Sequence, residues 1–189
     1  MSAKILKREE LLLRLFSIFR RSGFDGATLS KISRETGLGK ASLYHHFPGG
    51  KVQMAEEVLR FVENWNDQNL IVPLGGKGRP KQKIKNMIAT INDMYEGGKS
   101  GCLIGAFVPE DAFIEYQDQI KRILMKWIEA IAGVLIETGM ERKESMLRAE
   151  SAVAKIQGAL IVTKGTGQRA VFGRLMKSLP GELLEKRPG

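Results

Sequence analysis

The sequence predicts an all-α fold, and three observations support that prediction. Apolar residues recur at helical spacing in nearly every long stretch of the 189 residues. No stretch shows the sustained alternation of apolar and polar residues that indicates a half-buried strand. Glycine and proline divide the chain into helix-sized pieces, and the clearest break is the expected loop over residues 72–80. We therefore expect helices joined by loops along the whole chain.

The first expected helix spans residues 4–22. Its apolar residues recur three or four positions apart, so they share one helix face and predict the side that is buried. The residues of this face are Leu12, Leu15, Phe16 and Phe19.

A second, short helix is expected to begin after Thr28. Thr28 follows the turn signal Asp25-Gly26, and its hydroxyl can accept a hydrogen bond from the free N–H groups of the first turn. Gly37 is expected to end this helix, because glycine adopts a positive φ at little cost. Leu38 is then the one apolar residue of a tight turn and is expected to reach the core.

The third expected helix spans residues 40–47 and stops there because Pro48 cannot continue it. Leu43 and Phe47 are four residues apart, so both face inward. The outward side chains are polar, small or aromatic. A pair of short helices with such an outward face on the second one is what a helix-turn-helix reader of DNA requires. The outward residues are Lys40, Ala41, Ser42, Tyr44, His45 and His46.

Gly49-Gly50-Lys51 begins a fourth helix that is expected to run to about Ile71. Free N–H groups at its start, together with the lysine, suit a phosphate group. This helix links the first part of the chain to the rest. We therefore expect one domain over residues 1–50 and a second over residues 51–189.

The second domain is predicted to be helical throughout, with a frayed tail over residues 180–189. Its helices are expected at residues 81–97, 100–107, 111–138, 143–164 and 168–179.

Charge and composition narrow the class of function. Residues 1–51 carry ten Lys or Arg and four Asp or Glu, a net charge of +6 out of the total of +9. A basic surface concentrated on the expected DNA reader suits phosphate binding. The single cysteine excludes an internal disulfide framework and suits a reducing cytoplasm. No apolar run approaches membrane-spanning length, so no membrane partner is expected.

The segment from Thr28 to Lys51 resembles the DNA-binding domain of the TetR (tetracycline-repressor) family of bacterial transcription regulators. The family pattern is a threonine-capped helix, a Gly-apolar turn, a reader helix ending in Leu-Tyr-x-His/Tyr-Phe, and a following lysine. The segment Phe47–Lys51, with Ser100–Gly105 further on, resembles a subgroup that includes multidrug-resistance regulators. Gly39 departs from the family pattern, which usually has Ser or Thr there, so this position brings no hydroxyl for a phosphate. The residues that match the pattern are Thr28, Gly37-Leu38, Leu43–Phe47 and Lys51.

The resemblance implies a cytoplasmic, homodimeric repressor that binds palindromic double-stranded DNA and responds to a small-molecule inducer. It implies that Tyr44 holds a phosphate and that His45 reaches a phosphate or a base edge. No cofactor, metal or catalytic residue is expected. The implied DNA-binding residues are Thr28, Lys40, Ala41, Ser42, Tyr44, His45, His46 and Lys51.

Bulky apolar residues of the second domain have two interpretations. Each one alone is explained by an ordinary core. Together they lie on helices that, in the resembled family, surround an inducer cavity, and Met and Trp walls adapt to flat apolar molecules. The resemblance therefore implies an apolar or aromatic ligand. Its expected contacts are Phe61, Trp65, Met87, Met94, Phe107 and Trp127.

A stripe of small and apolar residues on the last two expected helices also has two interpretations. Such a stripe lets helices approach closely, either within one chain or between two copies. In the resembled family the last two long helices pair with their copies in a four-helix dimer interface. The expected interface residues are Ala152, Ile156, Ala159, Leu160, Thr163, Val171 and Leu175.

Other patterns favour ordinary explanations. The alternating cations at positions 77, 79, 81, 83 and 85 are expected to form a solvated face, with a second DNA contact as the alternative. Cys102 is expected to be buried and inert, with a sensing thiol as the alternative. No catalytic set, metal-ligand spacing or phosphate-binding glycine loop indicates an enzyme. A ligand-independent architectural DNA-binding protein is the main alternative function. The sequence names neither the ligand, the operator nor the regulated genes, and it does not decide between repression and activation.

Overall fold

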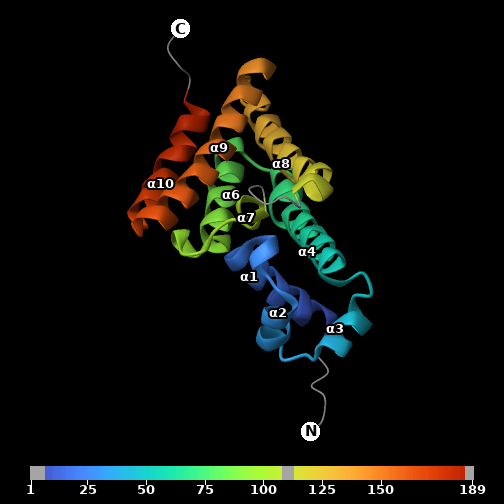
Figure 1. The fold of residues 1–189 in the computed structure, drawn as a ribbon. Helices are drawn as coiled ribbons and strands as arrows, with labels where there is room; N and C mark the ends of the chain where they lie inside the picture. The colour runs from blue at the N-terminus through green and yellow to red at the C-terminus, as the bar shows by residue number, and fades with distance from the viewer. Residues whose placement is uncertain (1–6, 108–112, 186–189) are drawn as a thin grey trace. The chain divides into compact units, whose positions relative to one another are not determined.

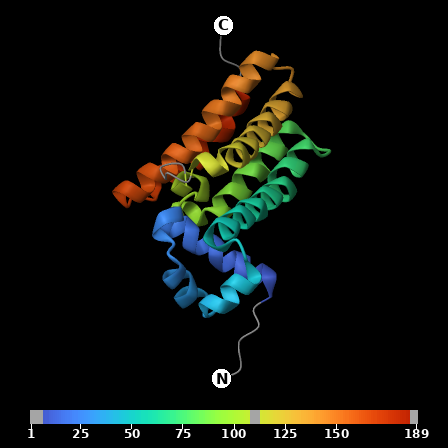
Figure 2. The same ribbon diagram turned by 45° about the vertical axis from the view of Figure 1, so that its right-hand side comes forward.

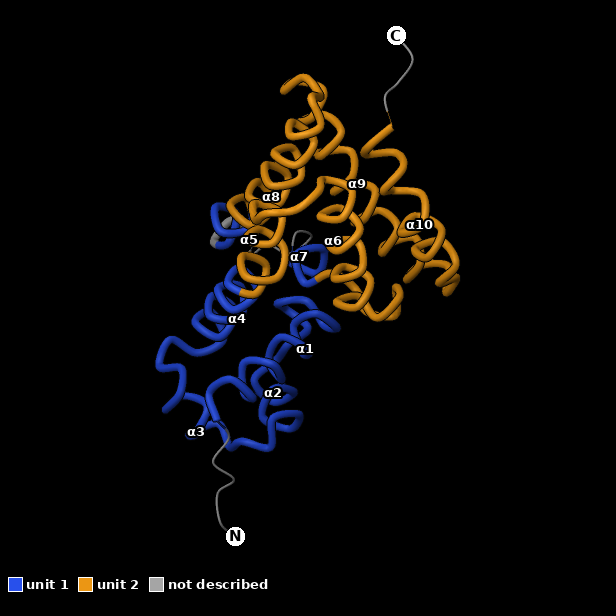
Figure 3. The backbone as a smooth tube through the Cα atoms, turned by 180° about the vertical axis from the view of Figure 1, so that it is seen from behind, with its two compact units in different colours: residues 1–64, 103–120 blue, residues 65–102, 121–189 orange. Residues whose placement is uncertain are grey.

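The computed structural model describes residues 7–107 and 113–185, and every regular element in them is a helix (Figure 1). The predicted all-α fold is thereby confirmed. The chain forms two compact units (Figure 3). Unit 1 comprises residues 1–64 and 103–120, and unit 2 comprises residues 65–102 and 121–189. Within the described residues, no helix is both long enough and apolar enough to cross a membrane.

Unit 1 is built on a long first helix that packs against α2 and α7. Gly23 breaks the helical geometry near the end of that helix, with φ of 68° and ψ of −178°. The buried residues of α1 are Leu11, Leu15, Ile18 and Phe19, whereas Leu12 and Phe16 are only half-buried. The predicted face is therefore confirmed for Leu15 and Phe19, and Leu12 and Phe16 lie at its edge. The elements are α1 (Arg8–Gly26), α2 (Leu29–Thr36), α3 (Lys40–His46), α4 (Gly50–Asn66) and α7 (Leu103–Phe107).

An aromatic cluster forms the centre of unit 1. Phe107 on α7 meets the ring of Phe19 at a centroid distance of 5.6 Å and that of Phe24 at 6.1 Å. Tyr116 completes the cluster, with centroids 5.7 Å from both Phe24 and Phe107. Edge-to-face pairs of this kind add to the gain from burying large rings. Helix α7 and Tyr116 are thus part of the core that supports α1, although about 80 residues separate α1 from α7 in sequence.

Unit 2 is a helical bundle in which α10 packs against α9 and α6. The two helices, in orange and red, run side by side in Figure 1, and Figure 2 turns the pair so that α9 lies in front. Their buried faces share one apolar core with α6 and α8, to which Ile91, Ile131, Ile156 and Phe172 each contribute a fully buried side chain. The elements are η1 (Asp67–Ile71), α5 (Val72–Gly75), α6 (Pro80–Met94), η2 (Glu96–Gly98), α8 (Phe113–Ile136), α9 (Arg142–Thr166) and α10 (Ala170–Leu184).

The loop expected from Val72 is wrong in its first part, because helix continues to Gly75. A π-helical turn, η1, joins α4 to α5, and the Val72 N–H donates to the carbonyl of Asp67, five residues back. Pro73 has no N–H to give to the preceding turn, so a regular α-helix would lose a bond here. Burial of Leu74, which is 2% exposed, holds the extra turn in place.

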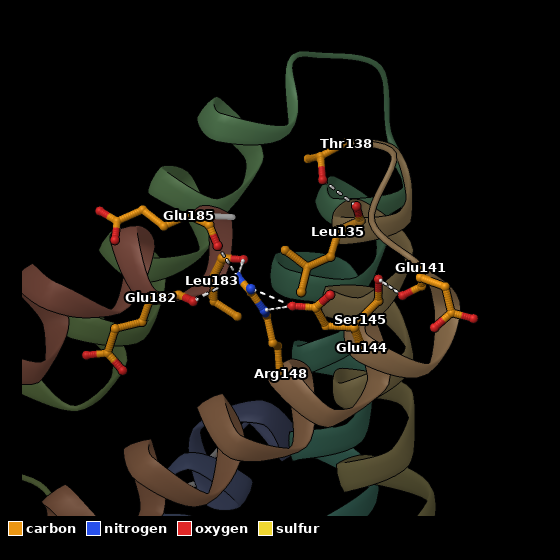
Figure 4. A network of polar contacts seen from close by, with 9 residues as sticks. All are labelled: Leu135, Thr138, Glu141, Glu144, Ser145, Arg148, Glu182, Leu183 and Glu185. Atoms are coloured by element: carbon orange, nitrogen blue, oxygen red, sulfur yellow. Dashed lines mark hydrogen bonds and ion pairs between the residues drawn. The ribbon is translucent and has the colours of Figure 1, made fainter. Parts of the chain in front are cut away.

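The frayed tail expected from Pro180 is also wrong up to the last described residue, 185. Helix α10 continues through Pro180 to Leu184, and Leu183 is 1% exposed. The side chain of Arg148 on α9 donates to the carbonyl of Leu183 at 3.2 Å and to that of Glu185 (Figure 4). Carbonyls at a helix end have no partner within the helix, so these bonds compensate for the one that proline removes. Residues 186–189 lie outside the described residues.

The remaining boundaries agree with the predictions to within a few residues, as helix ends usually do. The predicted starts at residues 4 and 111 lie outside the described residues.

One member of the expected solvated cationic run is buried. Lys83 has 6% of its side chain exposed, and its Nζ donates to both carboxylate oxygens of Glu137, at 2.8 and 2.9 Å. The other four cations of the run are exposed. Cys102 is half-buried and free of any disulfide.

Candidate nucleic-acid interface

The turn between α2 and α3 is fixed by short-range polar contacts. Thr28 caps α2 by accepting from the Lys31 N–H at 3.2 Å, as its position predicted. Gly37 ends α2 in the left-handed region with φ of 74°. The hydroxyl of Ser33 donates to the carbonyl of Leu38 at 2.7 Å, and the Leu38 N–H donates to the hydroxyl of Thr36 at 3.3 Å. These bonds satisfy the backbone of the turn and set the direction in which α3 leaves it.

Helix α3 is held to the core of unit 1 by two apolar anchors. Leu43 and Phe47 are both fully buried, as their four-residue spacing predicted. Leu38, at 6% exposed, adds a third anchor just before the helix. A seven-residue helix is too short to be stable alone, so its position depends on this packing. The anchors therefore present the opposite face of α3 in a fixed orientation.

The predicted DNA-binding residues lie mostly on that outward face. Lys40, Ala41, Tyr44 and His45 are exposed, and Ser42 and His46 are half-buried. Thr28 is exposed at the start of α2, where its hydroxyl is already used as a cap. Six of the eight predicted residues thus share one short helix, and the structure brings them together.

Tyr44 and Gly50 are neighbours at the junction of α3 and α4. Gly50 has a φ of 65°, and a Cβ added there would lie 3.4 Å from the Tyr44 ring. A larger residue would therefore be strained in its backbone, although its Cβ would only make an ordinary contact with the tyrosine ring. Glycine lets the first turn of α4 approach a ring that is 47% exposed.

Lys51 is placed differently from the other predicted residues. It is half-buried, and its Nζ donates to the carbonyl of Phe24 at 3.1 Å. The same Nζ lies 4.1 Å from the centroid of the Phe24 ring. This ammonium is therefore satisfied by the end of α1, a contact that sequence spacing does not reveal.

Arg8 is a residue of this region that the sequence did not single out. Its guanidinium lies 4.1 Å from the centroid of the Phe47 ring, and its Nη1 donates to the carbonyl of His46 at 2.8 Å. It also forms an ion pair with Glu57 on α4. Arg8 thereby joins the start of α1 to the end of α3. Its partners are 38 and 49 residues away, so no local pattern indicates them.

Comparison with known proteins identifies the family. Residues 12–58 match the family described as bacterial regulatory proteins, tetR family. Residues 78–178 match the family described as the transcriptional regulator LmrA/YxaF-like C-terminal domain. The chain belongs to the TetR family of transcriptional regulators.

Individual relatives agree with this membership. The chain is 24% identical over 162 residues to the uncharacterized HTH-type transcriptional regulator YxaF of Bacillus subtilis, covering 82% of this chain and 84% of the relative. Among solved structures, a TetR transcriptional regulator from Legionella pneumophila superposes with a TM-score of 0.82 at 19% identity, over 94% of this chain and 98% of the other. A cysteine mutant of the TetR family regulator CifR, complexed with 26-bp operator DNA, gives a TM-score of 0.73 at 15% identity, over 94% and 98%.

The residues expected to bind a TetR-type inducer fall into both units. Phe61 and Phe107 belong to unit 1, and Phe107 is fully buried in its aromatic cluster. The Trp127 indole is 4% exposed, and its N–H has no hydrogen-bond partner in the described part of the chain. None of the six residues lines the groove between α9 and α10 or the groove along α5 and α8. The four in unit 2 are Trp65, Met87, Met94 and Trp127.

The residues expected at a dimer interface lie mostly inside the chain's own core. Five of them are on α9 and are at most 8% exposed, and Val171 and Leu175 on α10 are half-buried. Packing within one chain accounts for this stripe. The five α9 residues are Ala152, Ile156, Ala159, Leu160 and Thr163.

A different face of α9 is open. Its residues follow one another at alternating steps of four and three, the spacing of a coiled-coil seam. They are apolar or small, and all except the half-buried Gly158 are exposed, which distinguishes them from the buried stripe. This pattern was present in the sequence but could not be separated from the buried one without the fold. The residues of this face, called the α9 seam below, are Leu147, Ser151, Ala154, Gly158, Ile161 and Gly165.

Side chains suited to metal binding are not grouped in the described residues. No set of three or more His, Cys, Asp or Glu side chains there could hold an ion. His45 and His46 are adjacent on α3, with ring centroids 5.9 Å apart and an interplanar angle of 70°.

Proposed function

We propose that this chain is a homodimeric repressor that binds a palindromic operator through α3 and releases it when a small apolar or aromatic molecule binds. In this proposal residues 1–50 read DNA, and residues 51–189 bind the ligand and dimerise. The observation that supports it best is the combination of two fully buried anchors, Leu43 and Phe47, with an exposed polar face on the same helix. The operator complex of the similarly folded CifR adds support.

The proposed reading mode places the outward face of α3 in the major groove. Lys40 at the start of the helix suits a guanine, because its ammonium can donate to the guanine O6 and N7 atoms. Tyr44 and the first turn of α4 suit phosphates, which position the protein without reading sequence. A helix of seven residues spans only a few base pairs. Two copies on adjacent half-sites are therefore needed for useful specificity, which predicts a palindrome.

The proposed dimer face is the α9 seam, extended by α10. Exposed Leu147 and Ile161, at 58% and 68%, leave apolar surface in water unless a partner covers it. The small residues Ala154 and Gly158 between them would let a second α9 approach closely. A second copy presents the same seam, so the contact is self-complementary about a two-fold axis.

The proposed ligand acts by preferring the form of the dimer that does not fit the operator, because equal affinity for both forms would shift nothing. The unpartnered Trp127 indole N–H supports a ligand that carries a hydrogen-bond acceptor. A coupling of roughly 1–3 kcal/mol would lower operator affinity about 5- to 150-fold. A screen of planar aromatic compounds by quenching of tryptophan fluorescence, followed by operator release, tests this part.

Selection of binding sites from random duplexes by the purified full chain tests the DNA-binding proposal. A palindromic consensus whose half-sites are about 10 bp or more apart is the expected result. Lys40→Ala should change the consensus, whereas the control Lys99→Ala, an exposed lysine of unit 2, should leave it unchanged. Recovery of no consensus, with binding that depends steeply on salt, would favour the architectural alternative. The proposed site of action is the cytoplasm, where bacterial operators lie.

A further inference from the structure

A groove of about 290 Å³ runs along α8 within unit 2, and neither the DNA-reading face nor the expected inducer contacts include it. One wall is formed by Ile71, Leu74 and Gly75 at the end of η1 and in α5. The other wall is α8. Its lining residues there are Lys126, Glu129, Ala130, Gly133, Val134 and Glu137.

Two glycines leave this groove open. A Cβ added at Gly133 or at Gly75 would meet no atom within 4 Å, and neither residue has a positive φ. Glycine inside a helix such as α8 is less favourable than alanine. Neither backbone geometry nor close packing therefore explains Gly133. Its effect is to keep the floor of the groove free of side chains.

The π-helical turn shapes the opposite wall. Helix η1 ends at Ile71 and delivers Ile71 and Leu74 to the groove. Turns of this kind are rare and occur frequently at functional sites. The ion pair between Asp67 and Lys126, at 2.8 Å, joins this turn to α8 at one end of the groove.

The charges around the groove do not balance. Lys126 is matched by Asp67, and Glu137 is matched by Lys83. Glu129 is exposed and has no hydrogen-bond or ion-pair partner within the described chain. Glu137 keeps 43% of its side chain accessible despite its partner. The groove thus combines apolar lining residues with one paired lysine, Lys126, and two accessible carboxylates, in a chain whose net charge is +9.

We propose that the groove between α5 and α8 binds a small lipophilic organic cation, with its apolar body on Ile71, Ala130 and Gly133 and its charge beside Glu129. Pockets for small molecules are mostly apolar with a few polar groups that fix orientation, and this groove has that composition. A quaternary ammonium of modest size fits the volume. The site is separate from the six expected inducer contacts, and it does not depend on DNA binding.

Calorimetric titration of the full-length protein with phenyltrimethylammonium tests the proposal, with the uncharged isostere tert-butylbenzene as the matched probe. We expect the cation to bind with one site per chain and the isostere to bind at least fivefold more weakly. Glu129→Gln should weaken binding of the cation about fivefold, as loss of one partly exposed charge pair does. Glu150→Gln, at an exposed glutamate on α9, is the control and should bind as the wild type does.

Filling the groove gives an independent readout. Gly133→Leu should reduce affinity at least tenfold, whereas Gly133→Ala, which adds only a Cβ in open space, should retain most of it and raise helix stability. If circular dichroism shows that Gly133→Leu does not fold, Gly75→Leu on the opposite wall takes its place in the binding measurement. Equal binding of the isostere, or wild-type binding by Glu129→Gln, would overturn the cationic class of ligand. No binding of phenyltrimethylammonium at millimolar concentration, or wild-type binding by both leucine variants, would overturn the site.

Discussion

The ammonium of Lys51 and the ring of Phe24 form a cation–π contact at 4.1 Å, and the same ammonium donates to the Phe24 carbonyl at 3.1 Å. The lysine that follows the reader helix in sequence is therefore part of the scaffold of unit 1. Phe24 in turn packs against Phe107 and Tyr116. The first turn of α4 is thus tied to the aromatic cluster that also holds α7.

The first prediction follows from this contact. Lys51→Met should lower the free energy of unfolding by about 1–2 kcal/mol, because it removes a partly buried cation–π contact and a hydrogen bond. Lys40→Met, at an exposed lysine with no partner in the described residues, should change it by less than about 0.5 kcal/mol. Urea denaturation of the two variants measures the difference. If Lys51→Met instead unfolds like the wild type and only the salt slope of DNA binding falls by about 1, the lysine is a phosphate contact.

The second prediction concerns Tyr44. Tyr44→Phe keeps the ring against Gly50 but removes the hydroxyl, so it should weaken binding to operator and to random duplex by the same factor. Fluorescence anisotropy on the two duplexes measures both affinities. His45→Ala is the comparison, because a residue that reaches a base edge should lose affinity for the operator more than for random DNA. A change in the specificity ratio for Tyr44→Phe would assign the tyrosine to base reading.

The short-range features of the reader were predictable because their partners lie within a few residues. Thr28 caps the helix that it precedes, Gly37 ends that helix, and Leu43 and Phe47 share a face by spacing alone. The contacts between residues far apart in sequence could not be predicted in this way. Lys83 is buried because Glu137 lies beside it, 54 residues away. No local pattern distinguishes it from the four exposed cations of its run.

The end of α10 and the exposed face of α9 in unit 2 also depend on contacts that local sequence does not reveal. Pro180 predicts a helix stop by local chemistry, but Arg148 supplies the donors that let α10 continue, and their partners are 34 to 37 residues away. The stripe on α9 fits both packing within the chain and an interface between copies, because periodicity does not say which of two faces meets α10 and which meets solvent. Only the packing of Ile156 against the chain's own core separates it from Ile161, which is 68% exposed.

The third prediction tests the α9 seam. Ala154→Arg should yield a folded monomer, because it puts a charge into a close helix contact without touching the core of the chain. Ala89→Arg makes the same change at an exposed position on α6 and should leave the dimer intact. Sedimentation velocity at micromolar concentration compares the two. A wild-type protein that sediments as a monomer would remove the dimer from the proposal.

The fourth prediction uses the pKa of Glu182. Hydrogen bonds from Lys155 and from Ser178, the latter at 2.7 Å, hold the pKa of this carboxyl below its usual range. A lowered pKa in the folded state means that the ionised form stabilises the fold at neutral pH, and that this contribution is lost as pH falls from the ordinary carboxylate range through the folded-state value. Lys155→Met should therefore raise the pKa of Glu182 more than Ser178→Ala does. Titration by carbon-detected NMR reports both shifts, and an unchanged pKa in Lys155→Met would contradict the assigned cause.

The fifth prediction exploits the unequal burial of Lys83 and Glu137. The lysine side chain is 6% exposed and the glutamate side chain is 43% exposed. Glu137→Gln leaves a buried ammonium without its counter-charge and should cost about 2–3 kcal/mol of stability. Lys83→Met replaces the buried charge with an apolar side chain of similar length and leaves Glu137 in contact with water, so its cost should stay below about 1 kcal/mol. Urea denaturation of both variants at neutral pH measures the asymmetry. Equal losses would mean that the pair contributes through its mutual attraction, and that burial of the lysine matters little.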